Sequence, residues 1–210
     1  MEFSDAAILP TRFGEFLVRA VREKRGEEEH LLVLRGEVKG KREVPVRVHS
    51  ECLTGDVMGS PRCDCRDQLE KALRLIEREG TGVLMDLRQE GRGIGLMNKI
   101  RAYSLQERGF DTVEANQLLG FGGDLRDYGL AVRILKVLGV KSVALITNNS
   151  KKIESLSLGG VQVARQIPLA VSPNRFNQRY LKTKGSKLGH LISSGKMRNP
   201  AVSAGKGRKA

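Results

Sequence analysis

The three cysteines of the chain are the residues best suited to chemistry, and they lie close together. Cys63 and Cys65 are one residue apart, and ten residues separate Cys52 from Cys63. Three thiolates in a small space suit a soft ion with tetrahedral coordination, for which zinc is the usual choice. Structural zinc sites normally have four protein ligands, whereas three ligands leave room for a water molecule that the metal activates near neutral pH. The cluster therefore predicts a zinc site of the catalytic type.

Two other interpretations of the cluster stay open on the residues alone. The cysteines could be buried and unreactive, although their clustering argues against this. His49, three positions before Cys52, could instead close a structural zinc site as its fourth ligand.

A Gly-rich segment, 90–95, has the character of an anion site. It reads Glu-Gly-Arg-Gly-Ile-Gly and links a predicted strand to a predicted helix. Backbone N–H groups at a helix start attract anions, and Arg88 and Arg92 add forked donors that match phosphate. The spacing fits neither a Walker A loop nor a dinucleotide fingerprint, and a plain structural turn would explain the glycines equally well.

A second candidate anion site is the segment 147–152, Thr-Asn-Asn-Ser-Lys-Lys, which ends a predicted strand and opens a helix. Open α/β sheets bind ligands at such junctions. Lysines are unfavourable at the positive end of a helix dipole, so Lys151 and Lys152 favour an anion nearby. Two solvated lysines are the alternative.

Three further residues have both a chemical and a structural interpretation. Asp124 and Asp127 precede a predicted helix and could simply cap it. Tyr103 lies on the helix after the Gly-rich segment, where a packing role is the simpler interpretation.

Hydrophobic periodicity predicts alternating strands and helices. The predicted strands are 13–21, 31–34, 44–49, 83–87, 142–147 and 161–167, with a turn at 26–29. The predicted helices are 64–79, 96–108, 125–138, one from about 150 to 159, and 174–184, while 111–116 is expected to be irregular. Pro45 suggests an edge strand or a strand start. We therefore expect an α/β (α+β) fold, with a mixed β-sheet core and flanking helices, in one compact domain over residues 1–192.

The positive charge is concentrated at the C-terminal end. The formal net charge is +13, yet eleven of the 37 Lys and Arg residues and none of the 24 Asp and Glu residues follow Glu154. Residues 193–210, rich also in Gly, Ser and Ala, predict a disordered basic tail. Aromatic residues are only 4% of the chain and do not alternate with the basic ones, so no base-stacking surface is visible.

The chain carries no signal for export or for the membrane. Residues 1–5 are acidic and polar, and no apolar run approaches the ~20 residues of a membrane helix. Three cysteines cannot all form pairs. We therefore expect a cytoplasmic protein with reduced thiols.

Together these features predict a hydrolase of a phosphorylated heterocycle, which holds a triphosphate beside a zinc-activated water. A zinc-stabilised RNA-binding module that uses the basic tail is the alternative. The arginines of the candidate site lie outside the tail, which favours the enzyme. A cytidine-deaminase type of zinc enzyme is disfavoured, because no His-x-Glu is followed by Pro-Cys-x-x-Cys.

Five motifs closely resemble GTP cyclohydrolase II. They are Arg-Val-His-Ser-Glu-Cys-Leu-Thr-Gly-Asp at 47–56, Arg-Cys-Asp-Cys at 62–65, the segment 88–96, Asn-Lys-Ile-Arg-Ala-Tyr at 98–103 and Thr-Asn-Asn at 147–149. The resemblance runs in register from about Pro10 to Leu191. It does not require the tail after about Ser193.

The resemblance implies a role for each matched residue. Cys52, Cys63 and Cys65 match the zinc ligands. The residues that match the nucleotide-binding set are Arg47, Val48, His49, Ser50, Glu51, Gln68, Glu90, Gly91, Arg92, Thr112, Thr147 and Lys152. Asp124 matches the proton acceptor, Arg126 the nucleophile at the α-phosphorus, and Tyr103 a tyrosine near the reacting ring. Because a guanidinium normally stays protonated, stabilising charge on the phosphate is an alternative role for Arg126.

The resemblance also implies the reaction and the partners. The family hydrolyses GTP to 2,5-diamino-6-(5-phosphoribosylamino)pyrimidin-4(3H)-one, formate and pyrophosphate, the first committed step of riboflavin biosynthesis. One Zn2+ per subunit, Mg2+ on the triphosphate and a homodimer are implied, with neither membrane nor nucleic acid required. The dihydroxybutanone-phosphate synthase domain often fused to this family has no counterpart here, so we expect a single-function enzyme.

Overall fold

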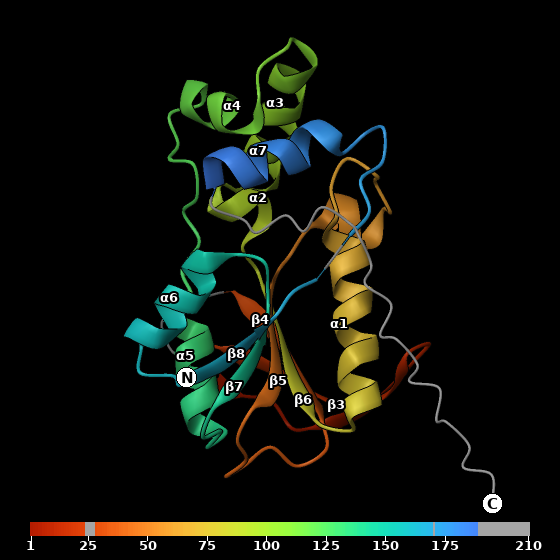
Figure 1. The fold of residues 1–210 in the computed structure, drawn as a ribbon, viewed down its shortest axis with the longest axis vertical. Coiled ribbons are helices and arrows are strands. Elements are labelled where there is room, and N and C mark those ends of the chain that lie inside the picture. The colour runs from red at the N-terminus through yellow and green to blue at the C-terminus, as the bar shows by residue number, and fades with distance from the viewer. Residues whose placement is uncertain (24–27, 170, 189–210) are drawn as a thin grey trace, which may run out of the picture.

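A mixed β-sheet of eight strands forms the centre of the computed structural model (Figure 1). The structure describes residues 1–23, 28–169 and 171–188. The predicted tail at 193–210 and part of the predicted turn at 26–29 lie outside these residues. The strands are β1 (Glu2–Phe3), β2 (Ala7–Thr11), β3 (Gly14–Arg22), β4 (Glu29–Arg35), β5 (Val44–Ser50), β6 (Gly82–Leu87), β7 (Val143–Ile146) and β8 (Val163–Ile167).

Half of the sheet is parallel, and this half positions the site. The strand order is β1-β3-β4-β6-β5-β7-β8, with β2 also paired to β3. Strands β6, β5, β7 and β8 are parallel neighbours, whereas β1 to β4 pair antiparallel and β4 joins β6 antiparallel. Because parallel strands end at the same edge, the segments that follow β5, β6 and β7 begin side by side, as binding sites of open α/β sheets require.

Helices cover both faces of the sheet and the edge where the parallel strands end. They are η1, a short π-helix (Leu53–Val57), α1 (Cys65–Glu79), α2 (Glu90–Gly93), α3 (Gly95–Glu107), α4 (Thr112–Leu118), α5 (Gly129–Val137), α6 (Ser150–Leu158) and α7 (Gln178–Leu188). In Figure 1, α1 lies on one side of the sheet and α5 and α6 on the other. The helices α2, α3, α4 and α7 gather beyond the upper ends of the strands.

Two apolar clusters hold these layers together. Val44, Val46 and Val48 of β5 pack with Ala131 and Leu135 of α5 in the larger cluster. The smaller cluster lies on the opposite face and joins α1 to β3, β4 and β6. The alternation predicted for β5 is therefore confirmed, with its valines on the face covered by α5.

The amphipathic pattern of α1 explains its position. Ala72 and Ile76 are fully buried against the sheet, and Leu69 and Leu73 pack beside them. The helix ends at Gly80, which has the left-handed φ of 64° that glycine adopts without strain. This helix fixes its own first turn, which carries Cys65 and Gln68, at the edge where β5 ends.

The predicted strands and most of the predicted helices are confirmed within a few residues. The expectation that 111–116 is irregular is wrong: α4 occupies it. Asp111 accepts hydrogen bonds from the N–H groups of Val113 and Glu114, and Glu114 accepts one from the Asp111 N–H, which makes a capping box. The edge position considered for Pro45 is also wrong, because β5 lies between β6 and β7, and the proline is at the start of the strand.

Two predicted helices begin later than expected. The segment 124–128 is not helical because Asp124 pairs with Arg126 and Leu125 N–H bonds to the Arg92 carbonyl, so α5 starts at Gly129. The Asp127 carboxylate accepts a hydrogen bond from Gly129 N–H at 3.0 Å, but the N-cap of α5 is Tyr128, so neither Asp124 nor Asp127 is the capping residue that the sequence predicts. Asn174 forms a turn with Phe176 and Asn177, so α7 starts at Gln178.

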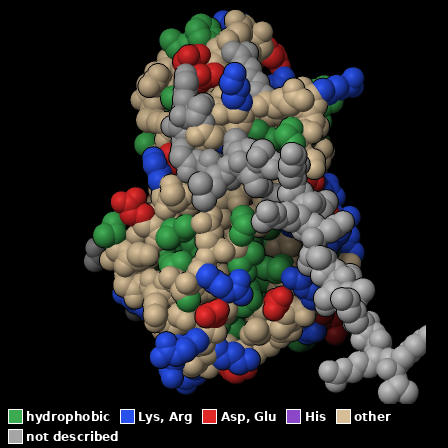
Figure 2. Space-filling view, in the orientation of Figure 1, with side chains coloured by type: hydrophobic (Ala, Val, Ile, Leu, Met, Phe, Trp, Pro, Cys, Tyr) green, Lys and Arg blue, Asp and Glu red, His purple; other side chains and the backbone are tan. Residues whose placement is uncertain are grey.

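Exposed basic side chains gather at the lower end of the face shown in Figure 2. The loop between β4 and β5, which carries the exposed Lys39, Lys41 and Arg42, lies at that end in Figure 1. This is the end opposite the carboxyl ends of the parallel strands. Among the described residues, no helix is long and apolar enough to cross a membrane.

Candidate metal and nucleotide site

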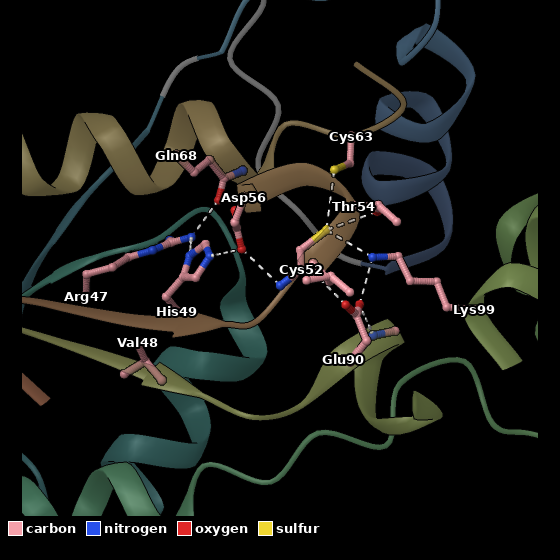
Figure 3. A network of polar contacts seen from close by, with 12 residues as sticks. Arg47, Val48, His49, Cys52, Thr54, Asp56, Cys63, Gln68, Glu90 and Lys99 are labelled. Atoms are coloured by element: carbon pink, nitrogen blue, oxygen red, sulfur yellow. Dashed lines mark hydrogen bonds and ion pairs between the residues drawn. The ribbon is translucent and has the colours of Figure 1, made fainter. Parts of the chain in front are cut away.

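The three cysteines converge where β5 ends and α1 begins, and Figure 3 shows two of them, Cys52 and Cys63. Their sulfur atoms lie within 4.8 Å of one another, and the Sγ atoms of Cys52 and Cys63 are 3.7 Å apart. Sulfurs bound tetrahedrally to zinc at ~2.3 Å would be ~3.8 Å apart. Gly55 lets the chain turn inside the cluster, because a Cβ there would lie 2.7 Å from the Cys63 sulfur and 3.0 Å from that of Cys52. The geometry and the donor set therefore fit zinc.

The charges of the three thiols are strongly linked. Hydrogen bonds from Cys63 and Cys65 lower the pKa of Cys52 well below its usual value. The reciprocal hydrogen bond with Cys52 raises the pKa of Cys63 to about 11, and contacts with both neighbours raise that of Cys65. Three adjacent thiolates need a cation between them, which is the condition that a divalent metal meets.

His49 does not belong to the cluster. Its Nε2 lies 3.0 Å from the Asp56 carboxylate, and its Nδ1 lies 3.4 Å from the Arg47 guanidinium. The same Asp56 oxygen accepts a hydrogen bond from Cys52 N–H at 2.9 Å. The interpretation of a structural site closed by His49 is therefore wrong. The histidine instead supports the loop that holds Cys52, through Asp56 (Figure 3).

Lys99 and Glu90 connect the cysteines to the Gly-rich segment. The Lys99 ammonium, on α3, donates to the Cys52 sulfur at 3.1 Å and to Glu90 at 2.7 Å. The other Glu90 oxygen accepts from Leu53 N–H at 2.7 Å. Burial opposes the charge of Lys99, yet the hydrogen bond with Glu90 and the Cys52 charge raise its pKa. The loop after β5, α2 and α3 are thus fixed to one another at the cluster.

Tyr103, also on α3, lies beside the cysteine loop. Its hydroxyl is 3.1 Å from the Thr54 hydroxyl, and that hydroxyl is 3.7 Å from the Cys52 sulfur. Burial raises the pKa of Tyr103, so the phenol keeps its proton at neutral pH. The Arg62 guanidinium lies over the ring, with its Cζ atom 4.9 Å from the ring centre. Tyr103 can therefore donate a proton or a hydrogen bond into the cleft.

Buried cations lie on the other side of the cleft, at the ends of β5 and β7. The Lys152 ammonium on α6 donates to the Val48 carbonyl at 2.7 Å. Burial and the positive charges of Arg47 and Arg126 lower its pKa well below the usual value. An anion in the cleft would relieve this excess of positive charge. Thr147, Asn148, Asn149 and Lys152 all line the cleft, so the junction at 147–152 faces it.

Asp124 holds Arg126 in a fixed orientation. The Nε and Nη2 atoms of Arg126 donate to the two carboxylate oxygens at 2.8 and 2.6 Å, a bidentate pair. Burial opposes the charge of Arg126, but the hydrogen bonds with Asp124 raise its pKa. Despite burial, Arg126 also lowers the pKa of Asp124. Arg126 therefore stays protonated, and Asp124 stays ionised.

Arg92 is held in an unusual backbone conformation. Its φ of 66° lies in the left-handed region, which non-glycine residues rarely adopt, and it follows Gly91 with a φ of 62°. Both terminal nitrogens of its guanidinium are buried and have no hydrogen-bond partner among the described residues. Buried donors without partners are costly. A strained, unsatisfied arginine that lines a cleft is typical of a ligand-binding residue.

One cleft contains nearly all of the predicted site residues. About 1020 Å³ of space, part of it open to solvent, lies between its lining residues. The predicted residues that line it are Arg47, His49, Ser50, Glu51, Cys52, Cys63, Cys65, Gln68, Glu90, Gly91, Arg92, Tyr103, Thr112, Arg126, Thr147 and Lys152. Val48 and Asp124 do not line it: the Val48 side chain is in the core, and Asp124 lies behind Arg126.

Several lining residues carried no functional prediction. They include Arg62, Lys99, Gln106, Asn116, Tyr180 and Lys184. Lys99 stands inside a motif quoted above, but a buried lysine at a thiolate is not visible from spacing. Tyr180 and Lys184 are distant in sequence from every motif, so only the fold brings them to the cleft.

Comparison with known proteins agrees with this site. A profile described as GTP cyclohydrolase II matches residues 2–168. Three similar curated proteins are each named "Riboflavin biosynthesis protein RibBA". The one from Chlorobium phaeovibrioides is 51% identical over 88% of this chain and 45% of its own length. Those from Bacillus cereus (strain ATCC 14579) and Synechocystis sp. are 54% and 52% identical, over 88% and 87% of this chain and 47% and 33% of their own lengths.

The chain thus spans between a third and about half of the length of these relatives. The match covers both segments that bear the cysteines, the Gly-rich segment and the junction at 147–152. On this evidence the chain belongs to the GTP cyclohydrolase II family.

Proposed function

We propose that this chain catalyses the zinc-dependent hydrolysis of GTP to 2,5-diamino-6-(5-phosphoribosylamino)pyrimidin-4(3H)-one, formate and pyrophosphate, in riboflavin biosynthesis. The observation that carries the proposal is one cleft lined both by a three-thiol cluster and by buried cations, of which Arg92 has two buried donors without a partner among the described residues. A triphosphate and a metal-assisted hydrolysis of a ring require these two halves together. Residues 1–192 would form the catalytic domain.

Cys52, Cys63 and Cys65 would hold the zinc. When bound, zinc supplies Lewis-acid activation of a water molecule for attack on the purine ring. Lys99 and Glu90 would fix the Cys52 sulfur, since Lys99 donates to both. Outer groups of this kind orient metal ligands and tune the metal.

The cations of the cleft would bind the triphosphate. Arg92 offers two free buried donors, and Lys152 and Arg47 supply buried positive charge. Burial strengthens their attraction to phosphate, because the local dielectric constant is lower than that of water. Mg2+ would accompany the triphosphate as its counter-ion. The remaining nucleotide-binding residues are proposed from the family pattern and their place at or beside the cleft.

Arg126 would stabilise negative charge on the α-phosphate. The bidentate pair with Asp124 fixes the guanidinium and keeps it protonated. A protonated guanidinium is a poor nucleophile, and a charge-stabilising role uses the side chain as it is. Asp124 would act on the reaction through Arg126.

Tyr103 would serve the reacting ring. Its phenol lies next to Thr54, on the cysteine loop, and keeps its proton at neutral pH. From this position it can hold the ring or give a proton to a nitrogen that leaves the opened ring. As a member of this family, the enzyme would act in the cytoplasm as a homodimer.

A single incubation tests the proposal. The protein is mixed with GTP and Mg2+, and formate and pyrophosphate are both counted against the GTP consumed. We expect one of each for every GTP. Tight RNA binding without GTP turnover would support the RNA-binding alternative instead.

A further inference from the structure

Helix α7 (Gln178–Leu188) lies after the residues matched by the family profile, yet it lines the cleft. The profile match ends at residue 168, and Tyr180 and Lys184 are both lining residues. In Figure 1, α7 crosses above the strand ends beside α2, and it packs against α4. The helix therefore completes a wall of the cleft that the profile match does not reach.

A chain of buried hydrogen bonds connects α7 to the nucleotide site. The Lys184 ammonium donates to one oxygen of Asp64 at 2.5 Å. The other Asp64 oxygen accepts from the Gln68 amide at 2.5 Å, and the Gln68 carbonyl accepts from the Arg47 guanidinium at 2.7 Å. All four residues are at most 9% exposed. These hydrogen bonds fix the orientation of the Asp64 carboxylate and of the Gln68 amide, which lie between Lys184 and Arg47.

Lys184 balances the charge of the buried Asp64 carboxylate in this series of hydrogen bonds. Asp64 lies between the two cluster residues Cys63 and Cys65, is only 4% exposed, and pairs with the Lys184 ammonium at 2.5 Å. Without the ammonium, this buried carboxylate would have no partner ion among the described residues. Removing one member of a buried ion pair leaves just such an uncompensated charge.

Tyr180 shows that the same helix also reaches Arg92. Its ring lies 5.6 Å from the Arg92 guanidinium and 4.7 Å from the Lys184 ammonium. Both distances are within the range of cation–π attraction. Helix α7 thus reaches two of the cations proposed to bind the triphosphate, Arg47 by way of Asp64 and Gln68 and Arg92 through the Tyr180 ring.

We propose that Lys184 is a positioning residue of the nucleotide site, which acts through Asp64 and Gln68 to orient Arg47 and through α7 to close the wall beside Arg92. The proposal rests on the proposed function. It assigns a role in substrate binding to a residue that lies after the end of the profile match at residue 168.

The first test is Lys184→Met in the full chain, compared with Lys184→Arg and with Lys182→Met. Lys182 is exposed on the same helix and gives a matched loss of charge. Lys184→Met should raise KM for GTP about 10-fold or more, the worth of a charged hydrogen bond, while kcat changes less. Lys184→Arg should recover part of this loss. Lys182→Met should behave like the unaltered protein.

A double-mutant cycle tests whether Lys184 acts through Asp64. Asp64→Asn removes the charge that Lys184 balances, so Lys184→Met should change KM several-fold less in the Asp64→Asn background than alone. An equal effect in both backgrounds would show that Lys184 acts elsewhere and would overturn the proposal.

Binding without turnover separates this proposal from the proposed function. The affinity for GTP is measured by calorimetric titration in the slow Tyr103→Phe background, which should keep its zinc, with and without Lys184→Met, and folding is checked by circular dichroism. We expect weaker binding by the same factor as the rise in KM. If the unaltered protein hydrolyses GTP and Lys184→Met leaves both KM and affinity unchanged, the role of Lys184 is wrong. If the unaltered protein releases no formate, the proposed function is wrong.

Discussion

The buried ammonium of Lys99 contacts a proposed zinc ligand and a proposed nucleotide residue at once. It donates to Cys52 and to Glu90, and Glu90 in turn holds Leu53 N–H. Lys99→Met should therefore weaken zinc binding roughly 10- to 100-fold, the usual effect of losing a group that orients a ligand. Zinc retention is measured against a competing chelator, with the exposed Lys136→Met as the control. A variant that holds zinc as tightly as the unaltered protein would show that Lys99 only packs.

The cysteine cluster makes the most direct prediction at the scale of single residues. Cys63→Ser should remove zinc together with both formate release and ring opening, because two thiolates and a hydroxyl are a poor zinc site. Metal content is measured by atomic absorption and formate by a coupled assay. A metal-free Cys63→Ser protein that still formed formate would contradict a catalytic role for zinc.

A substitution at Tyr103 should affect the rate of the reaction but not the binding of GTP. Tyr103→Phe keeps the ring beside Arg62 but removes the hydroxyl that lies at Thr54. We expect zinc content and GTP affinity to persist, while kcat falls by ~10²-fold or more, as for a lost acid–base group. Unchanged turnover would restore the packing interpretation of this tyrosine.

Helix α4 contributes to the cleft although its segment is predicted from the sequence to be irregular. It carries Thr112 and Asn116, two lining residues, and its capping box holds its first turn. Asp111→Ala should cost about 1 kcal/mol of stability and lower Tm by ~2–4 °C. Glu114→Gln, which keeps the side-chain acceptor of the box, is the matched control in a thermal melt. Equal Tm values for Asp111→Ala and the unaltered protein would mean that packing alone holds α4.

The elements that sequence patterns predicted well are those with strong periodicity. Alternation in β5 and the apolar stripe of α1 both correspond to buried faces. The start of α5 was misplaced because the Asp124–Arg126 pair replaces a helical turn, a contact that periodicity does not encode. The signal for α4, Asp111 with Glu114 three positions later, was present in the sequence and would have predicted the helix.

Site prediction has a similar limit. Residues inside the motifs, Arg92 among them, line one cleft. The left-handed backbone conformation of Arg92 cannot be predicted from any sequence pattern. Tyr180 and Lys184 stand in no motif, because their place follows from how α7 crosses the strand ends. A pattern can identify the chemistry of a segment, but only packing tells which distant helix completes the wall.

At the scale of the whole molecule, the parallel half of the sheet explains why one cleft collects so many groups. The carboxyl ends of β5, β6 and β7 lead to the cysteine loop, the Gly-rich segment and the Lys152 helix, respectively. Three segments that are distant in sequence thus face one space. The antiparallel half, β1 to β4, adds no residue to the lining and extends the sheet.

The distribution of charge along the chain leads to the last prediction. Eleven positive residues and no negative ones follow Glu154, but residues 193–210, predicted to be a disordered tail, lie beyond every residue placed in the site. Their positive field could still attract an anionic substrate over a Debye length of ~8–10 Å. Deleting 193–210 while keeping α7 should therefore leave kcat at saturating GTP unchanged, and raise KM only at low salt, as steady-state kinetics at two ionic strengths would measure. A truncated protein that folds and keeps zinc, yet loses turnover at saturating GTP, would place the tail in the site.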